Sequence, residues 1–111
     1  MNAAESIDAF AALAHEHRLA IYRLLVQAGP DGKAAGQIAT ALDMAPSSLS
    51  FHLAHLNRAG LITQRRESRS LIYSADFAQM NALVGFLTEN CCGGRSCAPA
   101  AEDIPTKRKR A

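Results

Sequence analysis

Apolar residues recur at helical spacing through the first thirty residues of the chain. Residues 7–14 carry an apolar stripe in a helix that Ser6 would cap. Residues 19–26 are apolar on more than one face, which is typical of a helix buried among others. Glycines and a proline at residues 28–32 then end the pattern. The first part of the chain is therefore predicted to form two helices, the second of them a core helix.

Two shorter helical patterns follow, at residues 34–42 and 47–59, with only a few residues and Pro46 between them. Apolar positions at i, i+3, i+4 and i+7 on both segments would pack together, and Ser47 is expected to cap the second segment. A tight turn between helices of these lengths predicts a helix-turn-helix.

The chain then changes to the composition of β-strands. Residues 61–65 and 70–74 flank a polar turn and predict a β-hairpin, or wing. Asp76 is expected to cap a last helix, with Gln79 as its reciprocal partner. That helix has an apolar stripe formed by Phe77, Met80, Leu83, Val84 and Leu87. The stripe fits either the core of one subunit or a dimer seam, and the small size of the chain favours the seam.

Length and composition limit the chain to one small globular domain. It has 111 residues, of which 49% are hydrophobic and 20% charged, so neither wholesale disorder nor a large enzyme fits. We expect a mainly α fold with a small β-hairpin in residues 1–92. Residues 93–111, which contain Cys97 and a basic end, are expected to form a flexible tail.

Features of targeting and catalysis are missing from the sequence. The longest apolar stretch, residues 82–87, is too short to span a bilayer, and no basic leader precedes it. Three cysteines within residues 91–97 suit thiol chemistry in a reducing compartment, so we expect a cytoplasmic protein. No phosphate loop, nucleophile elbow or zinc-protease pattern is present, which argues against an enzyme.

Charge divides unevenly along the chain. Residues 1–60 hold four basic and five acidic side chains, whereas residues 61–111 hold eight basic and five acidic ones. The predicted wing concentrates Arg65, Arg66 and Arg69, which would contact DNA phosphates or enter the minor groove unless they form only a solvated turn.

Short polar side chains on the second helix of the helix-turn-helix suit a helix that enters the DNA major groove. Ser47, Ser48 and Ser50 would contact bases and phosphates at short range, and His52 and His55 would reach further. The two histidines could instead ligate a metal, but no other ligand is near them in the sequence. His15 and His17 look like residues of a helix start.

Two segments resemble one known family. The sequences LAHEHRLAIYRLL at residues 13–25 and SSLSFHLAHLNRAGLI at residues 47–62 are similar to those of the ArsR family of winged-helix metalloregulatory repressors. The resemblance covers about residues 7–92. It implies a homodimer joined through the first and last helices, which represses transcription from operator DNA until an inducer binds.

The resemblance also narrows the set of ligands that could act as the inducer. The best-known arsenic sensors of the family carry a Cys-Val-Cys pair in the first helix of the helix-turn-helix, and residues 33–39 contain no cysteine. Zinc sensors of the family use carboxylates and histidines on the last helix, where residues 76–90 contain no histidine. The remaining candidates are Cys91, Cys92 and Cys97, which resemble the thiols of a variant arsenite-responsive subgroup.

Three thiolates suit arsenite, As(III), or antimonite, because these soft ions prefer three sulfurs on one side of a pyramid, whereas tetrahedral zinc needs a fourth ligand. Glycines at 93 and 94 would let the chain fold back to deliver Cys97. Methylated trivalent arsenic, which needs only two sulfurs, remains open. So do a redox response, a response to another metal, and thiols with no role.

Overall fold

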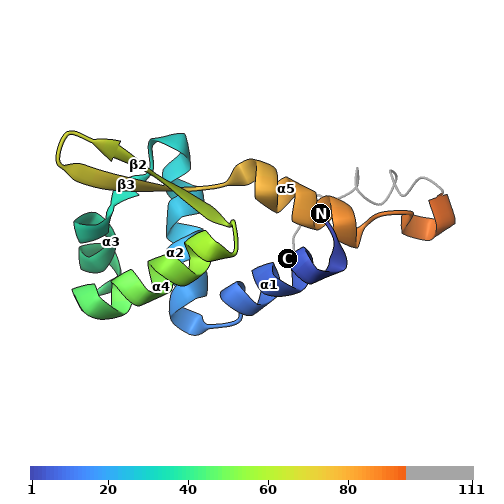
Figure 1. The fold of residues 1–111 in the computed structure, drawn as a ribbon, viewed down its shortest axis with the longest axis horizontal. Helices are drawn as coiled ribbons and strands as arrows, with labels where there is room; N and C mark the ends of the chain where they lie inside the picture. Colours follow the sequence, from blue (N-terminus) through green and yellow to red (C-terminus); the bar gives the residue numbers. More distant parts are fainter. Residues whose placement is uncertain (95–111) are drawn as a thin grey trace, which may run out of the picture.

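The computed structural model describes residues 1–94 and confirms a mainly helical winged helix-turn-helix with a small antiparallel sheet (Figure 1). Its five α-helices are α1 (Ala3–Leu13), α2 (Glu16–Ala28), α3 (Ala35–Leu42), α4 (Pro46–Arg58) and α5 (Phe77–Leu87). Short 3-10 helices follow α2 at Gly29–Asp31 and α5 at Cys91–Gly94. None of the helices in these residues is long and apolar enough to cross a membrane. The predictions for Cys97 and the basic end lie outside the described residues.

Helix starts differ from the sequence prediction in two of three cases. Asn2 caps α1 and forms a capping box with Glu5, so Ser6 lies inside the helix, where its hydroxyl donates to the Ala3 carbonyl. In α4 the cap position is Ala45 and the first turn begins with Pro46, so Ser47 is not the cap. Proline suits the first helical turn because the amide it lacks has no partner there.

The prediction for α5 is half confirmed. The carboxylate of Asp76 accepts a hydrogen bond from the Gln79 amide at 3.0 Å, as expected of a cap. The predicted reciprocal bond would run from the backbone amide of Asp76 to the side chain of Gln79. That amide donates instead to the Leu61 carbonyl at 2.8 Å.

The sheet has three strands in the order β1-β3-β2, all antiparallel. Strands β2 (Ile62–Glu67) and β3 (Ser70–Ala75) form the predicted hairpin, with Ile62 opposite Ala75. Strand β1 (Lys33–Ala34) pairs with the far edge of β3 and is not predicted by the sequence pattern. Two residues carry too little periodicity to indicate a strand, and their pairing depends on a partner about forty positions away.

A single core places the helix-turn-helix against the rest of the domain. Helix α4 packs on α1, α2 and α3, and β2 packs on α4. Burying each large aliphatic side chain contributes roughly 1.5–3 kcal/mol relative to exposure, before the entropy of ordering is subtracted. The fully buried large side chains are Ile21, Leu25, Ile38, Leu49, Leu56, Leu61 and Ile62.

Helices α1 and α5 lie side by side at the end of the molecule away from the wing (Figure 1). Helix α1 buries its small side chains, Ser6, Ala9 and Ala12, and leaves large ones exposed. In α5 only Leu83 is buried. The exposed apolar side chains on these two helices include Ile7, Phe10, Phe77, Val84 and Leu87. The stripe predicted on the last helix is thus mostly surface in one subunit.

Candidate nucleic-acid interface and thiol site

Helix α4 presents a polar face to solvent at its N-terminal end. Ser47, Ser48 and Ser50 are all exposed, and Phe51 beside them is 62% exposed. On the opposite side of the helix, Leu49 and Leu53 enter the core. The structure therefore leaves all three predicted serines exposed, where their hydroxyls can donate and accept hydrogen bonds at short range. Phe51 adds a large apolar contact to that surface.

The structure places His52 elsewhere. Its side chain is only 7% exposed and is turned toward the junction of α1 and α2, where the Arg18 guanidinium lies 3.4 Å from its Nδ1. Burial lowers the pKa of His52, and the nearby positive charges of His15 and Arg18 lower it further. A contact between His52 and DNA bases stays a prediction that this buried position does not favour.

His55 is half-buried and faces α1. It lines a hollow of about 230 Å³ together with Asp8, Ala11 and Arg58. Burial lowers the pKa of His55, with smaller contributions from Arg18 and Arg58. A contact between His55 and DNA stays a prediction that its half-buried position does not favour.

Arg18, on α2, connects the end of α1 to α4. Helix α4 is the reading helix, the one expected to enter the DNA major groove. The buried guanidinium of Arg18 donates from Nε to the Ala12 carbonyl at 2.7 Å and from Nη2 to the Ala11 carbonyl at 3.5 Å, both near the end of α1. Its Nη1 approaches His52 on α4. Carbonyls in the last turn of a helix carry partial negative charge, which offsets the cost of burying this cation.

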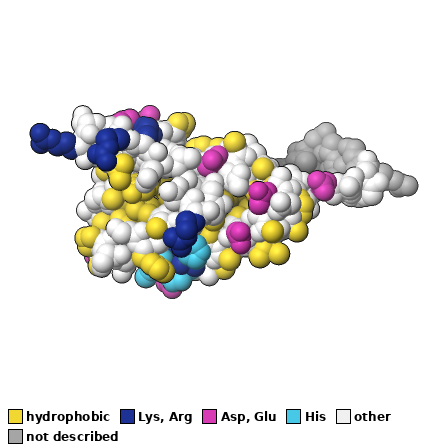
Figure 2. All heavy atoms as spheres, in the orientation of Figure 1, with side chains coloured by type: hydrophobic (Ala, Val, Ile, Leu, Met, Phe, Trp, Pro, Cys, Tyr) yellow, Lys and Arg dark blue, Asp and Glu magenta, His cyan; other side chains and the backbone are white. Residues whose placement is uncertain are grey.

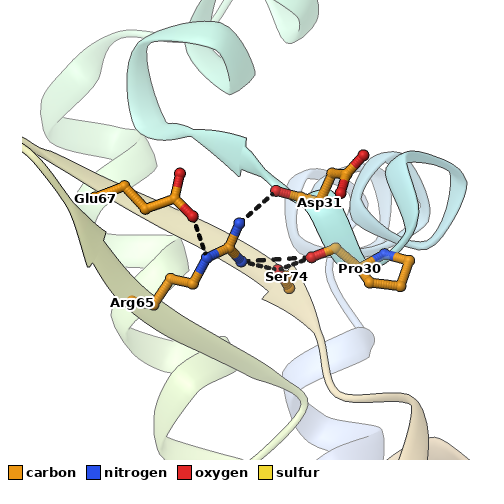
Figure 3. A network of polar contacts seen from close by, with 5 residues as sticks. All are labelled: Pro30, Asp31, Arg65, Glu67 and Ser74. Atoms are coloured by element: carbon orange, nitrogen blue, oxygen red, sulfur yellow. Dashed lines mark hydrogen bonds and ion pairs between the residues drawn. The ribbon is translucent and has the colours of Figure 1, made fainter.

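The three wing arginines are not equivalent. Arg65 donates to the carbonyls of Pro30 at 3.4 Å and Asp31 at 2.9 Å and to the Ser74 hydroxyl at 3.2 Å, and it pairs with Glu67 at 2.7 Å (Figure 3). These bonds hold β2 against the 3-10 turn that precedes β1. Arg65 is thus part of the scaffold that fixes the wing, although its side chain is still 43% exposed.

Arg66 and Arg69 lie on exposed backbone at the far end of the hairpin. Toward the rest of residues 1–94, neither side chain forms a hydrogen bond or an ion pair. Strong basic side chains without an internal partner are suited to phosphate contacts, which supply salt-sensitive affinity and little sequence readout.

A surface that sequence reasoning missed joins α4 to the wing. Asn57 on α4 and Gln64 on β2 line a shallow hollow of about 250 Å³, with Ser50 and Tyr73 at its edges. Both amides can read base edges or bind phosphates. The signal is weak in the sequence because the two residues lie on different elements, and only the packing of β2 on α4 brings them together.

The thiols lie beyond the end of α5. The Sγ atoms of Cys91 and Cys92 are 3.6 Å apart, and both residues are exposed. Adjacent side chains diverge on a regular helix, but Asn90 and Cys92 have positive φ values of 58° and 57°, which turn the chain so that the two sulfurs converge. Cys97, the third predicted ligand, lies outside the described residues.

Two sulfurs at this distance fit a single ion. For thiolates bound at about 2.3 Å, a tetrahedral or pyramidal ion separates its sulfurs by roughly 3 to 4 Å. The separation of the two sulfurs matches that geometry, but Cys92 is disulfide-bonded in this structure, so a thiolate site requires that this bond be reduced first.

Comparisons with known proteins match this chain to helix-turn-helix transcriptional regulators. A helix-turn-helix domain model matches residues 13–65. The transcriptional activator HlyU of Vibrio cholerae serotype O1 is 30% identical over 91 residues, which are 82% of each chain. Its reduced form has been solved, and that structure matches this one with a TM-score of 0.64.

Other solved structures extend the likeness. An ArsR-like regulator from Rhodococcus sp. RHA1 has a TM-score of 0.73 and 27% identity, with 95% of this chain and 96% of that chain covered. A homodimeric winged helix-turn-helix DNA-binding domain from Mycobacterium bovis, a possible ArsR-family regulator, has a TM-score of 0.61 and 31% identity. The match covers 82% of this chain and 84% of that chain.

Proposed function

Because this chain belongs to the ArsR family of winged helix-turn-helix transcriptional regulators, we propose that it is a homodimeric repressor that releases its operator when trivalent arsenic or antimonite binds its thiols. DNA-binding transcriptional regulation is the established part, and enzymatic catalysis is not a property of this family. The sign of the regulation, the dimer and the inducer are the proposed parts.

The exposure of the serines at the N-terminal end of α4 is the observation that carries DNA recognition. Ser48 and Ser50 would contact base edges in the major groove, and Arg66 and Arg69 would contact phosphates on the flanking backbone. The hollow lined by Asn57 and Gln64 lies between these two contact regions, so the backbone of the DNA would pass over it.

A second copy of the chain would cover the apolar surface of α1 and α5. Ile7 is 64% exposed, Phe10 42%, Val84 50% and Leu87 58%, which is a large apolar area for a chain this small. A twofold seam along these helices would present two α4 helices to successive major grooves of a palindromic operator. The homodimeric state of the M. bovis domain supports this arrangement.

The proposed inducer site consists of Cys91, Cys92 and Cys97. Once the disulfide at Cys92 is reduced, the 3.6 Å separation of the first two sulfurs supports binding of one ion by both. Three thiolates on one side of the ion match the pyramidal preference of As(III), which keeps a lone pair on the open side. Whether the site binds methylated arsenic in place of arsenite or antimonite depends on whether two or all three of the sulfurs take part.

Release requires that the inducer bind one conformation more tightly than the other. A coupling of about 1–3 kcal/mol per site is typical, which corresponds to roughly 5- to 150-fold in operator affinity, and a dimer would carry two such sites. The cysteines begin at Cys91, a short turn after α5 ends at Leu87, so closing a ring of sulfurs there would act on the proposed seam.

A response to oxidants is the second candidate. Cys92 is disulfide-bonded in this structure, and its sulfur lies 3.6 Å from the exposed sulfur of Cys91, which suits thiol–disulfide chemistry as well as ion binding by the reduced form. That the relative HlyU has been solved in a form named as reduced supports keeping this alternative.

A gel-shift titration tests the two candidates together. The full chain on operator DNA is treated in parallel with arsenite, antimonite, zinc and peroxide. We expect release by arsenite under reducing conditions, and loss of that release when all three cysteines are changed to serine. Release by peroxide alone would favour the oxidant sensor, and arsenite release that survives the triple change would eliminate the thiol site. Retained arsenite release in Cys97→Ser would show that two sulfurs suffice.

A further inference from the structure

Three histidines from two separate parts of the sequence meet at one place in the fold. His15 precedes α2, His17 lies in its first turn, and His52 lies on α4. Their ring centroids are separated by 5.4 Å (His15 to His17), 4.7 Å (His15 to His52) and 5.6 Å (His17 to His52). Figure 2 shows histidine side chains gathered on one edge of the molecule, beside a basic side chain.

The nitrogens of this cluster are close enough to share an ion. One ligand atom from each imidazole lies within 4.8 Å of the other two. Nitrogens bound to zinc at about 2.0–2.1 Å with a tetrahedral angle are roughly 3.3–3.5 Å apart, so the rings need to close by about 1 to 1.5 Å. His15 and His17 are exposed and can make that rotation, while His52 is buried and provides a fixed ligand.

We propose that His15, His17 and His52 form a binding site for a divalent transition-metal ion of the zinc class, separate from the thiol site. Three neutral imidazoles are a recurrent ligand set for zinc and leave a fourth position for water or another ligand. The site is borderline in softness, so it selects a different class of ion from the sulfur ligands beyond α5.

Existing hydrogen bonds set the cost of loading this site. The His17 amide donates to His15 Nδ1 at 3.1 Å, and Arg18 approaches His52 Nδ1 at 3.4 Å. An imidazole that binds metal through Nε2 carries its proton on Nδ1, so it can no longer accept there. Metal binding through Nε2 therefore gives up the His15 cap of α2 and the contact between Arg18 and His52.

The guanidinium of Arg18 also repels a cation, although its bonds to the Ala11 and Ala12 carbonyls offset part of its charge. Both costs predict a site weaker than a preformed one. The ion would link α4 to the junction of α1 and α2. Its affinity would therefore depend on where the reading helix lies relative to that junction.

Cobalt binding to a thiol-free chain tests the site. The full-length protein, made without an affinity tag and with Cys91, Cys92 and Cys97 changed to serine, is titrated with Co²⁺ and then with Zn²⁺. We expect visible ligand-field bands of tetrahedral cobalt at one ion per chain, displaced by zinc. We also expect zinc to raise the thermal midpoint relative to EDTA, because an ion that binds only the folded state stabilises it.

His17→Ala and His55→Ala are the matched pair of variants in this background. His17 is exposed, so its loss leaves the fold intact, which circular dichroism checks. It should weaken cobalt binding by about tenfold or more, whereas His55→Ala, which removes a histidine outside the cluster, should leave it unchanged. No ligand-field bands, bands that persist in His17→Ala, or equal losses in both variants would overturn the proposal. Removing the thiols keeps this result independent of the arsenic test.

Discussion

Single residues in this fold are fixed by contacts that their neighbours in the sequence do not reveal. Gly32 has φ +69°, and a Cβ there would meet the Tyr73 carbonyl oxygen and lie 2.6 Å from the Ser74 hydroxyl. Glycine is therefore required at this position for two reasons: the backbone has a positive φ, and β3 approaches too closely to leave room for a Cβ atom. By contrast, a Cβ at Gly36 would meet nothing within 4 Å, and its φ is not positive.

Gly32→Ala is expected to lower the free energy of unfolding by at least about 2 kcal/mol, because it adds strain in the backbone and a clash with β3. Gly36→Ala, on α3, should raise it by up to about 0.5–1 kcal/mol, because alanine favours a helix over glycine. Urea unfolding of both variants measures the difference. Equal stabilities for the two variants would contradict the close approach of β3 to Gly32.

Helix caps show where residue-level reading succeeds and where it does not. Asp76 can be identified because a carboxylate directly before an apolar stripe is the cap. Ser6 and Ser47 are wrong as predicted caps because α1 begins earlier, at the Asn2–Glu5 box, and because α4 begins with Pro46. Serine near a helix start is consistent with several positions in the first turn, and only the backbone decides between them.

At the scale of elements, the wing divides its arginines between structure and binding. Arg65 is bonded to the turn at Pro30 and Asp31 and to Ser74, while Arg66 extends from the same strand without a polar partner in residues 1–94. Neighbouring side chains on a strand point to opposite faces, which explains why one is drawn inward and the other is not. Composition alone treats the two as equivalent.

Arg65→Ala should destabilise the fold by about 1–2 kcal/mol, with solvent screening keeping the loss at the low end. Arg66→Ala should change stability by less than about 0.5 kcal/mol. It should instead weaken DNA binding for all sequences alike and reduce the slope of log affinity against log salt by about 1 for each phosphate that is no longer neutralised. Denaturant unfolding and salt-dependent DNA binding, measured on both variants, would show the roles reversed if this division were wrong.

The helices and the hairpin could be predicted because each has its own periodicity and turn residues. Strand β1 could not, since its two residues gain their conformation from β3. The same holds for the grouping of His15, His17 and His52, which depends on how α4 packs against α2. For the cysteines, the sequence predicted only that the following glycines let the chain fold back to deliver Cys97, whereas the convergence of the Cys91 and Cys92 sulfurs depends on the positive φ values of Asn90 and Cys92.

For the whole molecule, the exposed apolar surface of α1 and α5 has the largest consequence. Val84→Glu places a charge at the proposed seam, where burial without a partner is costly. We expect this variant to remain folded as a monomer and to lose most of its operator affinity, since two half-sites are no longer bound together. Sedimentation velocity and a gel shift measure the two effects.

Leu19→Glu is the matched control for this change. Leu19 is 45% exposed, close to the 50% of Val84, but lies on α2 instead of α5. Its variant should stay dimeric and keep operator binding. A Val84→Glu protein that still sediments as a dimer would place the seam elsewhere.

Arg18 contacts both α1, which is part of the proposed seam, and α4, the reading helix. Its guanidinium donates to the Ala11 and Ala12 carbonyls in the last turn of α1 and lies 3.4 Å from the His52 ring on α4, so it adds to the direct packing of α4 on α1 and helps to fix one helix relative to the other. In a twofold assembly built on α1, these contacts would hold the two α4 helices at a fixed separation. Operators whose half-sites are one base pair too close or too far apart would bind weakly because the rigid dimer cannot change its spacing, even though the bases within each half-site are the same.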